Sequence, residues 1–188
     1  MKRLLTFLAM LLMLGSAHAA QPLPGDSVYQ LPVQLTGQDG RQQLLSARRG
    51  RPQLVTMFYT SCKMVCPLII DSLRLTRNAL DPAIRSQIDL LAVSFDPARD
   101  DVATLRSYAD KRKLDPRVWT LARAEPAQVR QLSGLLGLQY RQLPDGEFNH
   151  SSELILLDAE GRIAARTSVI GRLDPAFVKA ITETVSSH

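Results

Sequence analysis

Short apolar runs alternate along the chain with longer stretches of helical spacing. Four runs are dominated by apolar residues and predict buried strands, at 53–59, 88–95, 118–121 and 153–157. Between and after them, apolar residues recur every three or four positions, which is typical of one face of a helix. Proline or aspartate marks the expected helix starts, at Pro67, Asp100-Asp101, Pro126 and Asp174-Pro175. The pattern therefore predicts a mixed α/β chain.

Two hairpins are predicted at the ends of this pattern. The first spans 28–45, with a glycine-rich turn in its middle, and the second spans 153–167. The segment 138–149 is polar and is expected to be a connection. The order is a hairpin, two βα units, a short βα unit, a second hairpin and a closing helix, which is a thioredoxin-like order. We therefore expect an α/β protein with a thioredoxin-like fold and an added N-terminal β-hairpin.

The first residues have the pattern of an export signal. Residues 1–3 are basic beyond the initiator Met, 4–14 are apolar, and 15–19 end in the small-x-small pattern that signal peptidase recognises. The eleven apolar residues are fewer than the ~20 needed to cross a bilayer. The sequence predicts a signal peptide at 1–19 and a single thioredoxin-like domain at 20–188. An uncleaved signal that anchors the protein to the membrane is the alternative.

Composition narrows the class of protein. The 188 residues are 45% hydrophobic, which is too apolar for a disordered chain. Aromatic residues make up only 5% and the formal net charge is +5, or +3 once Lys2 and Arg3 are removed. Few aromatic side chains are available to stack on nucleic-acid bases, so we expect no nucleic-acid partner. The basic clusters at 48–51 and 111–113 are interpreted as solvated surface or as docking sites for an acidic partner.

The two cysteines lie at the end of one predicted strand and the start of one predicted helix. Cys62 and Cys66 are spaced C-x-x-x-C, and Pro67 suits the first helical position, so Cys66 is expected at the N-cap. Free backbone N–H groups there favour a thiolate, and Lys63 adds a positive charge. We expect the pair to be acidic, exposed and reactive. An ordinary disulfide is the alternative, because an exported chain lies in an oxidising space.

His150 is the only interior histidine of the predicted domain, because His188 is the last residue of the chain. It precedes the strand at 153–157, which is expected in the same sheet as the strand before Cys62, so the imidazole can face the cysteine loop. Two thiolates and one imidazole suit copper, whereas a closed structural zinc site needs four ligands. Met57 is expected in the core. Met64, in the loop, remains open as a thioether ligand for Cu(I).

Three motifs in order resemble the Sco/SenC family over about residues 25–187. They are YTSCKMVCP at 59–67, VSFDPARD at 93–100, and NHSS at 149–152 before LILLD at 154–158. Members of that family are thioredoxin-like copper carriers that help to assemble the CuA centre of cytochrome c oxidase. The resemblance implies copper, as Cu(I) or Cu(II), on Cys62, Cys66 and His150. It also leaves Asp96 with two roles, support of the site or capping of the turn at Pro97.

The chain departs from the family pattern inside the cysteine loop. The family commonly has Pro after the first Cys and often Asp next, where this chain has Lys63 and Met64. All three ligand positions are retained, so the departure concerns redox tuning and delivery to the oxidase rather than copper binding.

Two functions follow from these residues, and the sequence leaves open whether the chain is an enzyme. One is a metallochaperone that passes copper to an apo-acceptor, for which the resemblance implies the CuA subunit of cytochrome c oxidase. The alternative is a periplasmic thiol-disulfide reductase, in which Cys62 and Cys66 act on the cysteines of a redox partner. A peroxidase ranks last, because Tyr59 stands where Thr is usual. Either main function implies an exported, periplasmic protein close to the membrane surface.

Overall fold

A seven-stranded mixed sheet forms the centre of the computed structural model, which describes residues 22–187. Its strand order is β2-β1-β5-β4-β3-β8-β9. These strands are β1 (Gln34–Gly37), β2 (Gln42–Leu44), β3 (Gln53–Phe58), β4 (Asp89–Ser94), β5 (Trp119–Arg123), β8 (Leu154–Leu157) and β9 (Ile163–Thr167). A separate two-stranded sheet consists of β6 (Tyr140–Gln142) and β7 (Phe148–His150).

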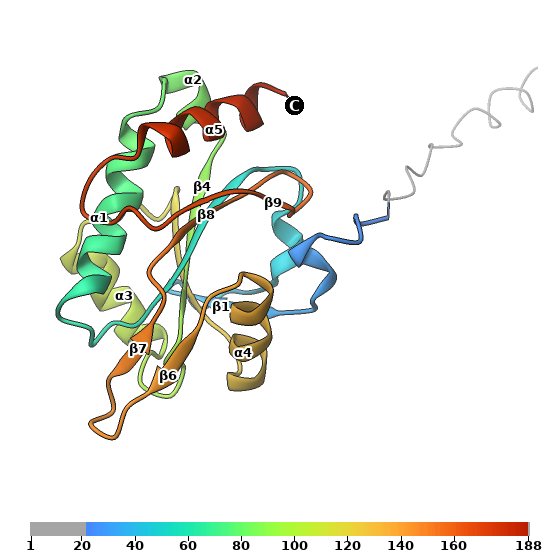
Figure 1. Ribbon diagram of the computed structural model, residues 1–188. Helices are drawn as coiled ribbons and strands as arrows, with labels where there is room; N and C mark the ends of the chain where they lie inside the picture. The colour runs from blue at the N-terminus through green and yellow to red at the C-terminus, as the bar shows by residue number, and fades with distance from the viewer. Residues whose placement is uncertain (1–21, 188) are drawn as a thin grey trace, which may run out of the picture.

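Helices cover both faces of the large sheet. They are α1 (Val65–Asn78), α2 (Pro82–Arg85), α3 (Val102–Lys111), α4 (Pro126–Leu135) and α5 (Pro175–Ser186), with two 3-10 turns, η1 (Val28–Gln30) and η2 (Leu45–Arg48). Helices α1, α3 and α5 lie on one side of the sheet and α4 lies on the other (Figure 1). The three strands β3, β4 and β5 run parallel, and β8 pairs antiparallel with β3. Because parallel strands with helices on both faces have no solvated side, their sequences are nearly continuous apolar runs.

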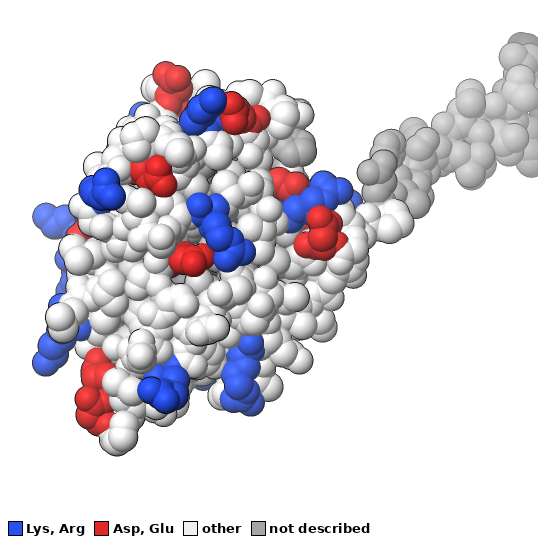
Figure 2. All heavy atoms as spheres, viewed as in Figure 1, with Lys and Arg blue, Asp and Glu red and all other residues white. Residues whose placement is uncertain are grey.

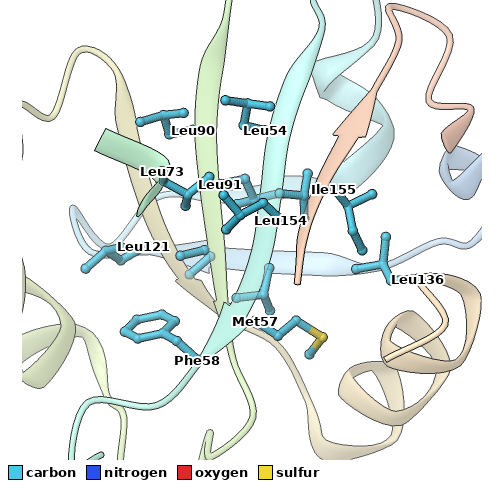
Figure 3. Packing of buried hydrophobic residues seen from close by; sticks show 14 of the residues in the cluster. Leu54, Met57, Phe58, Leu73, Leu90, Leu91, Leu121, Leu136, Leu154 and Ile155 are labelled. Carbon is cyan, nitrogen blue, oxygen red and sulfur yellow. The ribbon is translucent and has the colours of Figure 1, made fainter. Parts of the chain in front are cut away.

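The core lies between the central strands and the helices. All six residues of β3 are buried, and Leu73 of α1 and Leu136 after α4 approach the strands from opposite sides (Figure 3). Burial of one such side chain stabilises the fold by roughly 1.5–3 kcal/mol. Met57 is 1% exposed and packs among these side chains, as predicted.

The α/β class and both predicted hairpins are confirmed, with β1 pairing β2 and β8 pairing β9. Strand β1 also pairs with β5, so the N-terminal hairpin extends the large sheet. The segment 138–149 was expected as a polar connection, and this prediction is wrong. It contains β6 and most of β7, which close around the turn at Pro144-Asp145-Gly146. Short strands with polar side chains lack the apolar run that signals a buried strand.

The N-terminal signal predicted at 1–19 lies outside the described residues. Within 22–187, no helix has the length and hydropathy that a membrane crossing requires. The face shown in Figure 2 carries basic and acidic side chains interspersed with one another, without a continuous basic stripe.

Candidate metal centre

The cysteine loop connects the buried end of β3 to the first turn of α1. Residue 59 follows β3 directly, and the Cys62 N–H donates to the Tyr59 carbonyl at 3.4 Å. The Cys66 N–H then donates to Cys62 Sγ at 3.3 Å. The first N–H groups of a helix have no partner within the helix, so a sulfur placed there is favoured as a thiolate.

The helix start differs from the prediction for Cys66. Met64, not Cys66, occupies the N-cap position, and its side chain makes no capping hydrogen bond. Cys66 lies inside the first turn, and its N–H serves the sulfur of Cys62. The predicted site of thiolate stabilisation therefore moves from Cys66 to Cys62, because the helix starts before Pro67 rather than at it.

Both thiols are free and buried, and their acidities diverge. Cys62 is 7% exposed and Cys66 is 0% exposed, so the expectation of an exposed pair is wrong. Burial raises the pKa of the Cys62 thiol, but hydrogen bonds from Cys66 and from the Met64 N–H outweigh burial, and the pKa lies below its ordinary value. Burial raises the pKa of the Cys66 thiol far above its ordinary value, and the neighbouring Cys62 raises it further. The expectation of an acidic pair holds for Cys62 alone.

His150 closes the site from β7. Its Nε2 lies 3.7 Å from Cys66 Sγ, and its Nδ1 lies 2.8 Å from the Ser151 carbonyl oxygen. A carbonyl oxygen only accepts, so Nδ1 donates to Ser151 and Nε2 is the ring nitrogen that faces Cys66 Sγ. The ligand atoms of Cys62, Cys66 and His150 all lie within 4.8 Å of one another. The predicted convergence of these three side chains is therefore present, although His150 ends β7 instead of preceding β8 within the large sheet.

Aromatic side chains hold the imidazole in place. The Tyr59 ring meets the His150 ring edge to face at 5.9 Å between centroids, and Phe95 packs against the imidazole at 5.0 Å. The Tyr59 hydroxyl donates to Glu147 Oε2 at 2.8 Å, and the Phe148 N–H donates to the same hydroxyl at 3.4 Å. Tyr59, the residue after β3, thus contacts the β6–β7 hairpin that carries His150. This hairpin projects at the bottom of the view in Figure 1.

The buried Asp100 supports the cysteine loop. From the sequence, this residue was expected only to mark the start of a helix. Asp100 is 1% exposed and accepts from the Thr60 N–H at 3.0 Å, the Thr60 hydroxyl at 2.5 Å and the Ser94 hydroxyl at 2.5 Å. These bonds join the loop before Cys62 to the end of β4. The only sign of this role in the sequence was an aspartate shortly after Asp96-Pro97. Its partner Thr60 is distant in the sequence, so the pattern did not indicate the contact.

Asp96 has contacts that fit both of the roles predicted for it, although its turn contacts come from the backbone and not from the carboxylate. Its carboxylate forms an ion pair with Arg99, and its backbone carbonyl accepts from the N–H groups of Arg99 and Asp100. The backbone of Asp96 therefore shapes the turn, while its side chain holds Arg99. The Arg99 guanidinium in turn donates to the Gly146 carbonyl at the tip of the β6–β7 hairpin, at 2.5 Å.

Two neighbours of the cysteines in the sequence are exposed to solvent. Lys63 is exposed, and Met64 is 83% exposed. The described residues therefore offer two thiolates and one imidazole as converging donors, with a solvent-facing loop beside them.

The chain matches the family model described as SCO1/SenC over residues 22–185, which is most of its length. The chain belongs to the SCO1/SenC family. The resemblance inferred from the three sequence motifs is thereby confirmed. A candidate copper-binding protein of Stutzerimonas stutzeri is 24% identical over 146 residues, which are 76% of this chain and 70% of the relative.

Solved structures of Sco proteins share the fold. Copper-bound ScoI of Bradyrhizobium japonicum superposes with a TM-score of 0.65 at 23% identity, covering 81% of this chain and 97% of the other. Copper-bound yeast Sco1 gives 0.68 at 23% identity, covering 84% and 88%. A SCO1/SenC family lipoprotein of Bacillus anthracis gives 0.71 at 19% identity, covering 82% and 94%. The thioredoxin-like arrangement predicted from the sequence is confirmed by these neighbours.

Proposed function

We propose that this protein is a metallochaperone that carries one copper ion on Cys62, Cys66 and His150. The observation that carries the proposal is the convergence of two sulfurs and one imidazole nitrogen within 4.8 Å. Soft thiolates favour Cu(I), and imidazole extends the site to Cu(II). The Ser151 carbonyl orients the imidazole as an outer hydrogen-bond partner does in metal sites. Copper is the cargo here, not a resident catalyst.

Delivery follows from the same donor set. Two thiolates and one imidazole leave a coordination position through which the thiol or imidazole of an acceptor can enter, so copper can pass by stepwise ligand exchange. Family membership supports the CuA subunit of cytochrome c oxidase as the acceptor. The solvent-facing loop with Lys63 and Met64 lies beside the sulfurs, where an acceptor would approach. No nucleic acid takes part in this function.

The proposed location is outside the cytoplasm. Removal of residues 1–19 would release the domain at 20–188 into the periplasm, and an uncleaved signal would tether it to the membrane surface. The lipoprotein from Bacillus anthracis, a family member of similar fold, supports a location at the membrane surface.

A copper titration tests the two sulfurs. The reduced protein is expected to bind one Cu(I), and Cys62→Ser or Cys66→Ser is expected to abolish tight binding, because two thiolates provide the soft donors. Competition with a chromophoric Cu(I) chelator measures the affinity. Met64→Leu is the control, and it should leave the affinity unchanged because its side chain is 83% exposed. Tight 1:1 binding by the double cysteine variant would refute the site.

A second titration isolates the imidazole. His150→Ala is expected to weaken Cu(II) binding more than Cu(I) binding, because two sulfurs can hold Cu(I) almost linearly while Cu(II) prefers nitrogen donors. Electron paramagnetic resonance of the Cu(II) form should lose its nitrogen hyperfine structure. Equal affinities of wild type and variant for both ions would assign His150 a structural role.

A thiol-disulfide reductase is the second candidate, and the unequal thiols favour it. The Cys62 thiolate, with its lowered pKa, would attack an acceptor disulfide. The buried Cys66 would then attack Cys62 Sγ, release the reduced acceptor and leave an internal disulfide, so two electrons pass to the acceptor. A reductase does not need His150. Full disulfide-reducing activity in His150→Ala, together with weak copper binding in wild type, would favour this function over the first.

A further inference from the structure

We propose that a cavity at the opposite end of the sheet from the cysteines binds a small phosphate-bearing anion. Gln53, Asp89 and Trp119 line the cavity and are the first residues of β3, β4 and β5. These three strands are parallel, and Cys62 follows the other end of β3. A ligand in this cavity would therefore leave the candidate metal centre open.

The charge of the lining favours an anion. Four arginines line the cavity against two carboxylates, those of Asp39 and Asp89, so the lining side chains carry a net charge of four minus two, or +2. The arginines are Arg41, Arg48, Arg49 and Arg51. The cavity volume of about 340 Å³ lies within the range of roughly 300–1,000 Å³ that is usual for small-molecule pockets.

Arg48 differs from Arg49 and Arg51 in that, among the described residues, it forms no ion pair with a carboxylate. Arg51 forms a two-point ion pair with Asp89, and Arg49 pairs with Glu160. Among residues 22–187, the Arg48 guanidinium donates only to neutral oxygens, to Gln53 Oε1 at 3.1 Å and Thr120 Oγ1 at 2.7 Å. Its buried Nε has no hydrogen-bond partner within the same residues.

A half-buried cation is costly when no carboxylate bonds to it directly, because burial removes the water that would stabilise it. The carboxylate of Asp89 acts on the charge of Arg48 but is already paired with Arg51, and it offsets only part of the effect of burial. Burial accordingly lowers the pKa of Arg48. A bound anion in the cavity would add a counter-charge beside the Arg48 guanidinium, which Asp89 compensates only in part. Phosphate is the best match, because its oxygens accept two parallel bonds from the planar guanidinium. The cluster at residues 48–51, interpreted from the sequence as solvated or docking surface, thus becomes the wall of a binding site.

Trp119 provides a built-in reporter. It is the single tryptophan of the chain and it borders the cavity, so its fluorescence reports on this place alone. Titration of the metal-free protein with inorganic pyrophosphate is expected to change the Trp119 emission saturably, with a 1:1 stoichiometry by calorimetry. Sodium chloride at matched ionic strength is the control for screening. Bound pyrophosphate should also raise the melting temperature, since it binds only the folded state.

Matched variants test the residues. Arg48→Gln is expected to weaken pyrophosphate binding about tenfold or more, the size of a lost charge-assisted pair. Arg172→Gln removes the same charge at an exposed position outside the cavity, and it should change the affinity less than twofold. If Arg48→Gln does not fold, Arg41→Gln replaces it, because Arg41 is exposed and its ion pair with Asp39 is long at 3.6 Å. Arg41→Gln should weaken binding several-fold.

A vesicle-binding experiment distinguishes a lipid headgroup from a soluble phosphate compound as the ligand. Sedimentation of the protein with phosphatidic acid vesicles, but not phosphatidylcholine vesicles, and its release by pyrophosphate would assign a lipid headgroup. Binding of pyrophosphate without vesicle binding would assign a soluble phosphate. Absence of saturable binding to both probes, or equal losses in Arg48→Gln and Arg172→Gln, would overturn the proposal. Loss of copper binding in the cysteine variants would not change pyrophosphate binding. Failure of the copper proposal can therefore be distinguished from failure of the anion proposal.

Discussion

Cys62 and Cys66 are four positions apart, yet their thiols are shifted in opposite directions. Cys62 accepts from the Cys66 N–H in the first turn of α1, which favours its thiolate, whereas the Cys66 side chain is fully buried against the core. Copper binding must therefore remove a proton from Cys66 that burial retains. The positive charge of the metal supplies the driving force, because coordination favours the thiolate. In the metal-free protein the thiolate of Cys62 is therefore favoured, whereas the thiolate of Cys66 forms only when metal binds.

The exposed Lys63 is expected to tune this pair through its charge. A nearby ammonium favours the Cys62 thiolate of the reduced form over the neutral disulfide. Lys63→Glu is therefore expected to raise the thiol pKa and to shift the reduction potential to more negative values, on the order of 20 mV. A thiol-redox titration measures the potential, and the shift should shrink in high salt because the charge is exposed.

The control for this change is Lys179→Glu, which reverses the same charge on the exposed side of α5. It should leave the potential in place. A potential that is unchanged or more positive in Lys63→Glu would show that Lys63 does not act on the sulfurs.

At the scale of elements, the cysteine loop depends on the connection between β4 and α3. Asp100 and Asp101 are adjacent in that connection but do different things. Asp101 caps α3 by accepting from the Thr104 N–H at 2.7 Å, whereas the buried Asp100 accepts from Thr60 and Ser94. One aspartate starts a helix, and the other fixes the loop that leads to the cysteines.

Asp100→Asn tests this support. The new amide would place donors where the Thr60 N–H and two hydroxyls need acceptors, so a buried donor would lose its partner. The free energy of unfolding is expected to fall by about 1–3 kcal/mol. The Cu(I) affinity should also fall, because the loop before Cys62 is less well fixed. Chemical denaturation and chelator competition measure the two effects.

Asp101→Asn is the matched control, because it removes the same charge from the neighbouring residue. Asn caps a helix about as well as Asp, so stability should be almost unchanged. If both variants lose the same stability, the effect is one of charge rather than of the bonds to Thr60 and Ser94.

At the scale of the whole molecule, the N-terminal segment closes over the far end of the fold. Tyr29 in η1 is 2% exposed and packs on the turn between β8 and β9, where a Cβ on Gly161 would come within 2.5 Å of its ring. The Gly161 backbone has φ +79°, so glycine serves both the turn and the close approach. The Tyr29 hydroxyl is buried without a hydrogen-bond partner among the described residues.

This burial predicts an alkaline loss of stability. Burial raises the pKa of Tyr29 from 10.0 to about 12, so the unfolded chain releases the proton first as the pH rises. Tyr29 therefore contributes stability that is complete below pH 10 and is lost as the pH rises to about 12. Denaturation between these values should show wild type losing about 2–3 kcal/mol more than Tyr29→Phe, which cannot ionise.

Tyr108→Phe should behave in the same way, because burial also raises the pKa of Tyr108 to about 12 and its hydroxyl has no partner in the described part of the chain. If the free energy of unfolding changed with pH in the same way for wild type and both variants, the raised pKa values of the two tyrosines would be contradicted. At neutral pH both variants should be as stable as wild type, since no hydrogen bond is lost.

The linear pattern of the sequence was sufficient for the large sheet, for its two hairpins and for the three side chains that converge at the candidate metal centre. Apolar runs mark β3, β4 and β8 because strands buried on both faces must be apolar throughout. The C-x-x-x-C spacing and the histidine before 153–157 indicated the donor set because few residue types bind soft metals. These features depend on residue type and local spacing, which the sequence carries directly.

Tertiary structure alone decided the state of each donor and the partners that hold it. Burial of Cys66, the bond of its N–H to Cys62 and the opposite shifts of the two thiols depend on where α1 begins relative to the core. The strands β6 and β7 are too short and polar to be read from periodicity. The bonds of Asp100 to Thr60, and of Tyr59 to Glu147, join residues 40 and 88 positions apart. Contacts at such separations arise only when the chain has folded, because nothing in the local sequence records which distant group a buried polar side chain will meet.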